Sequence, residues 1–276
     1  MRKTTPQLGL SAAELETLPF ARHYRPQMAM PQPQVLEALA LGPMASALFP
    51  PLAAAADLTA PGYSAVETGY TTGPGFGSRI HCLTDMPGVT PDMWAWWFGW
   101  HGCDGRRYKL WHPQAHVDAR WADGRVDEAY LGRTSRVTEY IGASRVEATI
   151  SFVRPAVLGL DEVALARQGA VAICARLGDP KIPIKGGWLV HHIRPTERGS
   201  EMRSRFWIGG ETVGLGTAPA PGGAQRACAP FRPLARIMAP APRDLLAHCG
   251  QEMAHLAGIL PALHAEFGPN QIGDAA

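Results

Sequence analysis

The run RVEATISFV at residues 145–153 decides the fold class, because its β-branched and aromatic residues are typical of a strand. Apolar and polar residues alternate along it, so one face of the strand is expected to be apolar and the other polar. Gly, Pro, Asp or Arg residues bound similar runs at 106–112, 136–142, 170–177, 186–194 and 201–209. This spacing lacks the helix that a parallel sheet needs between strands, so the sequence predicts an antiparallel sheet.

Residues 243–267 show a different pattern, which predicts one long amphipathic helix. Its apolar residues recur at steps of three and four: Leu245, Cys249, Met253, Leu256, Leu260, Leu263 and Phe267. Asp244 is expected to cap the helix, and Pro261 to bend it slightly on the face opposite the apolar stripe. Gly268 and Pro269 are expected to end it. A sheet closed by one long C-terminal helix is an α+β arrangement with room for a cavity between them.

The N-terminal part of the chain, residues 1–60, is rich in Ala, Leu and Pro. Pro43, Pro50 and Pro51 interrupt it, so it is expected to form short helices whose apolar faces pack on another surface. That surface is either the main body or a second subunit. We divide the chain into a helical segment at 1–60 and a domain at 61–276, and we predict that the segment buries its apolar surface in a dimer contact.

The composition excludes several classes of protein. The chain has 276 residues, of which 46% are hydrophobic and 18% charged, so it is not expected to be disordered. A net charge of +2 gives nucleic-acid binding no electrostatic support. No apolar run is long enough for a transmembrane helix, and the N-terminal residues are not expected to be a secretory signal peptide because no apolar stretch follows the basic ones. The five cysteines are widely spaced, which favours reduced thiols and a cytoplasmic location.

Two candidate metal or catalytic clusters contain histidines. In the C-terminal helix, His248 and Glu252 lie one turn apart, with Glu252 inside the apolar stripe, where a carboxylate is costly unless it is paired or bound to metal. An ordinary surface ion pair is the alternative. Residues 96–121 combine several tryptophans with three histidines and a tyrosine. They predict either an apolar pocket with imidazole ligands or a packed aromatic core. No HExxH or cysteine-pair zinc motif is present.

Two strands carry further candidates. Glu147 lies on the polar face of 145–153, and that face is exposed to water or lines a cavity. His191 and His192 alternate in the apolar strand at 186–194, so one imidazole is expected to point inward. A buried histidine that is only hydrogen-bonded is the alternative.

At these residues the sequence resembles the 2,4-diacetylphloroglucinol hydrolase and phloretin hydrolase family. The resemblance spans roughly residues 65–268. It rests on MWAWWFGWHG (93–102), RYKLWHPQAH (107–116), the Glu of RVEATISF, GGWLVHHIRP (186–195), EMRSRFWIGG (201–210) and HCGQEMAHL (248–256). It implies a zinc enzyme that hydrolyses the carbon–carbon bond between an acyl group and a phloroglucinol ring. The implied fold is a helix-grip, START-like domain preceded by a small helical dimerisation segment.

The resemblance also implies roles for particular residues. The implied zinc ligands are His116, Glu147, His248 and Glu252. Tyr108 and one of His191 and His192, with His191 slightly favoured, are implied to act on the substrate. The expected pocket residues are Trp97, His101, His112 and Phe206. Position 119 is Ala and position 206 is Phe, and both depart from the pattern of the diacetylphloroglucinol enzyme.

The sequence therefore predicts a zinc-dependent hydrolase of a small acylated polyphenol, acting as a homodimer without nucleic-acid or membrane partners. Two alternatives stay open. One is a non-catalytic module of the same fold that binds a hydrophobic ligand. The other is a metal-dependent hydrolase or decarboxylase of a different phenolic or diketone compound.

Overall fold

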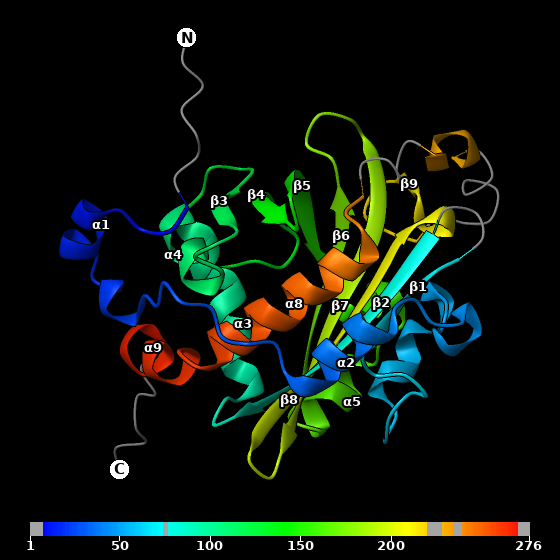
Figure 1. Cartoon of the computed structure of the whole chain (residues 1–276), viewed down its shortest axis with the longest axis horizontal. Coiled ribbons are helices and arrows are strands. Elements are labelled where there is room, and N and C mark those ends of the chain that lie inside the picture. Colours follow the sequence, from blue (N-terminus) through cyan, green and yellow to red (C-terminus); the bar gives the residue numbers. More distant parts are fainter. Residues whose placement is uncertain (1–7, 74–76, 220–227, 234–238, 270–276) are drawn as a thin grey trace.

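A single curved antiparallel sheet forms the centre of the molecule, and a C-terminal helix crosses one face of it (Figure 1). The computed structural model describes residues 8–73, 77–219, 228–233 and 239–269. The strands in these ranges are β1 (Gly69–Thr72), β2 (Gly77–Pro87), β3 (His116–Trp121), β4 (Thr134–Ile141), β5 (Ser144–Val153), β6 (Val171–Gly178), β7 (Ile184–Thr196), β8 (Gly199–Gly209) and β9 (Gly214–Leu215). Their order in the sheet is β1-β2-β8-β7-β6-β5-β4-β3, and β9 pairs with β7.

The helices lie toward the two ends of the chain, between β2 and β3, and between β5 and β6. They are α1 (Ala12–Thr17), α2 (Pro33–Leu41), α3 (Pro91–Trp100), α4 (Gly105–Trp111), α5 (Glu162–Arg167), α8 (Pro242–Ala257) and α9 (Leu260–Phe267). Helix α8 lies across the sheet, and its apolar stripe of Leu246, Cys249, Met253 and Leu256 is fully buried. The prediction of an α+β helix-grip fold is confirmed.

Residues 106–112 were predicted to be a strand, but residues 106–111 belong to helix α4 and His112 follows the end of that helix. The side chain of Asp104 accepts a hydrogen bond from the backbone N–H of Arg106 and so caps the helix. Tyr108, Leu110 and Trp111 are buried on the side facing the core. The aromatic residues that suggested a strand are therefore explained by burial of this face of the helix. In so short a segment, packing against the core outweighs the strand propensity of the individual residues.

The C-terminal helix is also divided where we predicted one continuous helix. Helix α8 ends at Ala257, and α9 begins at Leu260 with Pro261 in its first turn. Proline has no N–H to donate and its φ is already helical, so it favours a helix start over a bend. Asp244 is not the cap, because Ala241 holds that position. Asp244 lies in the first turn, where the negative charge of a carboxylate interacts favourably with the helix dipole.

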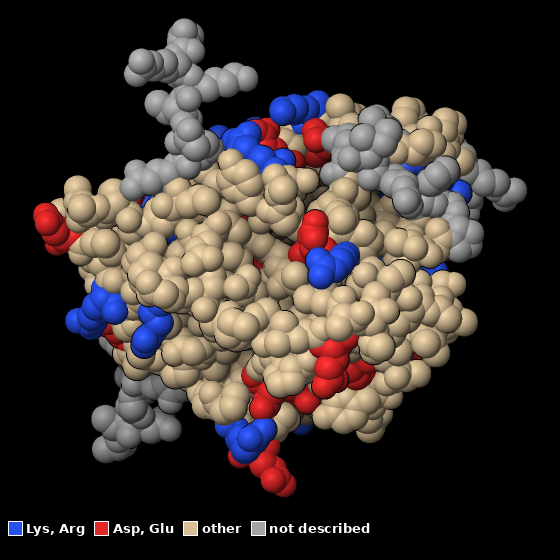
Figure 2. Space-filling view, viewed as in Figure 1, with Lys and Arg blue, Asp and Glu red and all other residues tan. Residues whose placement is uncertain are grey.

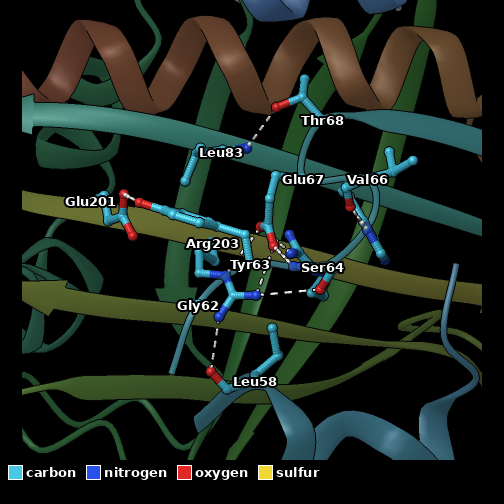
Figure 3. A network of polar contacts seen from close by, with 12 residues as sticks. Leu58, Gly62, Tyr63, Ser64, Val66, Glu67, Thr68, Leu83, Glu201 and Arg203 are labelled. Carbon is cyan, nitrogen blue, oxygen red and sulfur yellow. Dashed lines mark hydrogen bonds and ion pairs between the residues drawn. The ribbon is translucent and has the colours of Figure 1, made fainter. Parts of the chain in front are cut away.

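The outer face of the sheet is covered by a second apolar cluster and by residues 58–68. Trp188, Val190 and Trp207 pack there against the segment around Leu58. The Glu67 carboxylate pairs with the guanidinium groups of Arg203 and Arg205, which are both 2% exposed. Figure 3 shows the Arg203 side chain directed at the Leu58 carbonyl and at Ser64, while the Tyr63 hydroxyl meets Glu201. These contacts tie the end of the N-terminal segment to β8.

The rest of the N-terminal segment packs partly on the body of the protein. Val35 and Ala38 of α2 are buried, and α2 lies against α8 (Figure 1). Gly250 permits this approach, because a Cβ atom there would lie only 2.8 Å from Val35 Cγ1. Within the described ranges, no helix combines the length and the hydropathy that crossing a membrane requires.

Candidate active site

Four titratable side chains meet between the sheet and α8: His116 of β3, Glu139 of β4, and His248 and Glu252 of α8. The Oε2 atom of Glu139 lies 3.3 Å from His116 Nε2 and 3.5 Å from His248 Nε2. The Oε2 atom of Glu252 lies 3.4 Å from His116 Nε2 and 3.6 Å from His248 Nε2. Each carboxylate therefore faces both imidazoles.

The local folding of the chain explains this convergence. His116 is the first residue of β3 and is directly opposite Glu139 in the register of β3 and β4, so their side chains are neighbours across the two strands. His248 and Glu252 are four residues apart on α8 and share one face of the helix. Packing of α8 on the sheet then brings the two pairs together.

The donor atoms fit a metal ion. His116, His248 and Glu252 are buried, and the ligand atoms of these three residues lie within 4.8 Å of one another. The Nε2 atoms of both histidines are buried and have no hydrogen bond of acceptable geometry. An ion with ligand bonds of about 2.1 Å in a tetrahedron separates neighbouring ligand atoms by about 3.4 Å. The four nitrogen–oxygen distances above agree with this spacing.

The Nδ1 atom of His116 lies 2.9 Å from the Tyr108 carbonyl oxygen. A backbone carbonyl can only accept, so Nδ1 carries the proton and Nε2 is left with a lone pair for a metal. An imidazole fixed in this way by a second contact is typical of metal-binding histidines.

The carboxylates dominate the electrostatics of the cluster in the absence of a metal ion. Burial by itself would lower the pKa of His116, but the nearby carboxylates of Glu139 and Glu252 raise that pKa to about 9. Burial would likewise raise the pKa of Glu139, but the nearby imidazoles of His116 and His248 hold that pKa well below the usual range. Both carboxylates thus favour a positive charge between them, as a cation would provide.

Tyr108 contacts this cluster through both its ring and its hydroxyl. The ring stacks on the imidazole of His116, with centroids 3.7 Å apart and planes within 5°. The hydroxyl donates a hydrogen bond of 2.7 Å to Glu139 Oε2. Burial, together with the charges of Glu139 and Glu252, raises the pKa of Tyr108 well above its ordinary value. The phenol is therefore a proton donor at neutral pH.

Glu147, the carboxylate that we assigned to the metal by resemblance, does not lie in the cluster. It projects from β5 on the side opposite Val146 and Ala148, and it forms ion pairs with Arg145 and Lys181. Glu139 occupies the place that we gave to Glu147. A signal for Glu139 was present in the sequence, because in β4 it alternates in phase with Val137 and Ile141, which face the core.

A cavity of about 190 Å³ opens beside the cluster. Tyr108, Glu139, His248 and Glu252 line one part of it. Aliphatic side chains of β4 to β8 and the aromatic rings of Phe98, Phe152 and Phe206 line other parts of it.

Some of the predicted pocket residues line the cavity and others do not. His191 lines the cavity, where its Nδ1 atom is 2.8 Å from the Ser204 hydroxyl, and Phe206 and His101 also line it. His192 projects from the other face of β7 and does not line the cavity. Burial lowers the pKa of His191 to about 3, so its ring is neutral.

Trp97 and His112 lie behind the cavity wall and do not line it. Trp97 stacks on His101 with centroids 5.2 Å apart. His112 stacks on the ligand-type His248, with centroids 4.8 Å apart and planes within 10°. Burial, followed by the nearby His116 and His248, lowers the pKa of His112 to about 2. His112 therefore supports His248 as a neutral ring.

Fold and site together define a class: a helix-grip domain whose cavity carries a buried set of candidate metal ligands. The chain belongs to the DAPG hydrolase family, because residues 48–265 match the family model described as the DAPG hydrolase PhiG domain. The prediction of a hydrolase of this family is confirmed.

Proteins similar to this chain include two bacterial 2,4-diacetylphloroglucinol hydrolases. The protein from Pseudomonas sp is 31% identical over 276 residues, covering 93% of this chain and 90% of its own. The protein from Pseudomonas protegens is also 31% identical, with 93% and 87% covered. The phloretin hydrolase of Eubacterium ramulus is 31% identical over 202 residues, which is 69% of each chain.

Among solved structures, the ginseng major latex-like protein 151 from Panax ginseng overlaps 62% of this chain and 97% of its own. Its sequence identity is 12% and its TM-score 0.32. A similarity this small carries no information about function.

Proposed function

We propose that this protein is a zinc-dependent hydrolase that cleaves the bond between an acyl carbon and a phloroglucinol-type ring. The observation that carries the proposal is the buried cluster of two imidazoles and two carboxylates in the wall of an apolar cavity. The names of the relatives, diacetylphloroglucinol and phloretin hydrolases, supply the substrate class.

In this proposal His116, Glu139, His248 and Glu252 hold the metal. Two imidazole nitrogens and two carboxylate oxygens at these spacings suit a four-coordinate zinc ion. When bound, zinc would act as a Lewis acid that polarises a carbonyl group and lowers the pKa of a bound water molecule.

The reaction adds water to the acyl carbon and breaks its bond to the ring. The electron pair of that bond remains on the ring carbon, which must then gain a proton. Tyr108 is the candidate donor, because its raised pKa keeps the hydroxyl protonated beside the ligands. His191 is neutral and held by Ser204, so it suits hydrogen bonding to a phenolic oxygen or to the acyl group. The products are the phloroglucinol and a carboxylic acid.

The test is hydrolysis of monoacetyl- and diacetylphloroglucinol by purified protein, followed by loss of the aryl-ketone absorbance and by chromatography of the acid. We expect turnover in protein that contains about one zinc per chain, loss of turnover after chelation, and recovery with added zinc. Tight binding of these ketones without any turnover by zinc-loaded protein would instead indicate the non-catalytic binding module.

We also propose that the segment 1–60 is a dimerisation element of the domain at 61–276. Met30 and Leu41 are 75% and 76% exposed, and Leu36 and Leu48 are also exposed. Figure 2 shows few charged residues over the centre of the face that carries α2 and α8. An exposed apolar surface of this kind is typical of contacts between subunits, and a second copy of the chain offers the same surface by symmetry.

Sedimentation at micromolar concentration tests this proposal. We expect a dimer for the natural chain and a shift toward monomer for Leu41→Glu. A monomeric natural chain would contradict the proposal.

We also propose a reducing, cytoplasmic location. The five cysteines are all free, which supports this proposal.

A further inference from the structure

We propose that Ser204 is a positioning residue, which holds His191 as the tautomer that carries its proton on Nε2 and so presents a hydrogen-bond donor to the cavity. The chemical consequence of this inference rests on the proposed function, whereas the tautomer itself can be measured without turnover.

The register of the sheet makes these two residues neighbours. Ser204 of β8 is directly opposite His191 of β7, and both side chains lie on the inner face of the sheet. Ser204 is fully buried, and His191 is 3% exposed. The rings of Phe98 and Phe206 lie against the imidazole, with centroids 5.9 and 5.8 Å from its own. A hydrogen bond between Ser204 and His191 is therefore shielded from bulk water.

One hydrogen bond of 2.8 Å joins His191 Nδ1 to Ser204 Oγ. Because burial lowers the pKa of His191 to about 3, the ring is neutral at pH 7 and carries a single proton. Among the residues that the structure describes, neither side chain makes another hydrogen bond. Two arrangements satisfy this contact. Either the hydroxyl donates to Nδ1 and Nε2 carries the ring proton, or Nδ1 donates to the hydroxyl and Nε2 keeps a lone pair.

The hydroxyl proton of Ser204 decides between the two arrangements. If Nδ1 donates, this proton needs another acceptor. The Cys249 thiol is close by, but sulfur accepts hydrogen bonds only weakly. A buried donor that lacks a partner costs free energy equivalent to a factor of about 5 to 150 in an equilibrium constant. If the hydroxyl donates to Nδ1, both groups are satisfied, and this arrangement is favoured by up to about that factor.

The favoured arrangement leaves the Nε2–H group of His191 for a ligand in the cavity, which this ring lines. In the proposed reaction, such a donor stabilises negative charge as it develops on the acyl oxygen or on a phenolic oxygen. A protonated Nε2 cannot also take a proton, so His191 acts as a donor and not as a general base. Ser204 is not among the described residues that line the cavity, so it acts only through the ring of His191.

Nitrogen NMR of protein labelled with 15N-histidine tests the tautomer at pH 7. An imidazole nitrogen without a proton resonates far downfield of one that carries a proton, and His191→Gln identifies the two signals by their absence. We expect Nδ1 of His191 in the downfield region and Nε2 in the upfield region. A protonated Nδ1 would overturn the inference.

Ser204→Ala tests the role of the hydroxyl, and Ser204→Thr restores it. We expect the Nδ1 signal to move further downfield in Ser204→Ala, because the nitrogen loses its donor, and to return in Ser204→Thr. At unchanged zinc content, kcat should fall about 2- to 12-fold in Ser204→Ala, as for loss of one neutral hydrogen bond, and recover in Ser204→Thr. An Nδ1 signal that stays in place in Ser204→Ala would reject the role of Ser204.

Ser200→Ala is the matched control. Ser200 is also fully buried on β8, but its hydroxyl has no hydrogen-bond partner within the described ranges. This variant should keep the natural spectrum of His191 and the natural rate.

The spectrum and the turnover separate this inference from the proposed function. A Nε2–H tautomer that depends on Ser204, in protein that hydrolyses no acylphloroglucinol, would support the inference and reject the hydrolase. Hydrolysis by protein in which Nδ1 of His191 carries the proton would reject the inference and keep the hydrolase.

Discussion

Tyr108→Phe removes one hydroxyl group from the centre of the site and leaves its other contacts in place. The phenyl ring still stacks on His116, and the backbone carbonyl of residue 108 still accepts the hydrogen bond from His116 Nδ1. Only the hydrogen bond of 2.7 Å to Glu139 Oε2 is lost. The variant therefore measures what this one donor contributes to metal binding and to turnover.

The expected magnitude follows from the charge on Glu139. A hydrogen bond to a charged group contributes about 1.5–3 kcal/mol, or a factor of about 10 to 150 in an equilibrium constant. Removal of a group that orients a metal ligand commonly weakens metal binding by about 10- to 100-fold. We expect Tyr108→Phe to bind one zinc at saturation with an affinity reduced by about this factor. At saturating zinc, loss of a general acid should lower kcat by about 100-fold or more.

Competition with a chromophoric chelator gives the zinc affinity, and initial rates at saturating zinc give kcat. Tyr140→Phe is the matched control, since it removes a hydroxyl from the next residue to Glu139, on the other face of β4. Equal zinc affinity and equal kcat in Tyr108→Phe and the natural protein would refute the reasoning. A normal affinity with a reduced kcat would restrict Tyr108 to a role on the substrate.

Two further predictions concern residues away from the ligands. Glu67→Gln leaves the buried Arg203 and Arg205 without their anion, so we expect a loss of about 3–5 kcal/mol in the free energy of unfolding, measured by urea at pH 7. Burial would raise the pKa of Glu67, but the two arginines lower it from 4.5 to about 2, so this stabilisation is complete above pH 4.5 and is lost as the pH falls toward 2. The difference between natural and variant protein should therefore shrink at pH 3, and a constant difference would contradict this origin. His191→Ala should lower kcat with zinc content unchanged, whereas His192→Ala should not slow turnover by zinc-loaded protein; the opposite order would place the wrong histidine in the cavity.

Elements of the fold could be predicted from the sequence where a periodic pattern extended over many residues. The alternation in β5 and the apolar stripe of α8 each extend over enough residues to identify the element and its buried face. The β-branched and aromatic runs of β6 to β8 identify strands that are buried on both faces. Residues 106–112 were too few for a helical period to appear, and their aromatic content suggested a strand. Pro261 looked like a mid-helix residue because the apolar stripe continues across the break between α8 and α9.

Part of the candidate site could also be predicted from the sequence, because two of its residues are close together along the chain. His248 and Glu252 are neighbours on one helix, so spacing alone brought them together. The partner of His116 depends on the register of β3 and β4, which no local pattern specifies. Glu139 and Glu147 lie in adjacent strands, and the resemblance alone selected the one that faces outward. Attention to the alternation within 134–141 would have favoured Glu139.

The central claim is that Glu139, together with His116, His248 and Glu252, holds one zinc ion that the reaction requires. Zinc stoichiometry after equilibrium dialysis of Glu139→Gln and Glu147→Gln tests this claim most directly, with folding checked by circular dichroism. The structure predicts that Glu147→Gln retains about one zinc per chain, while Glu139→Gln loses zinc and hydrolytic activity together. A Glu139→Gln protein that keeps its zinc and its turnover, beside a Glu147→Gln protein that loses both, would contradict the account.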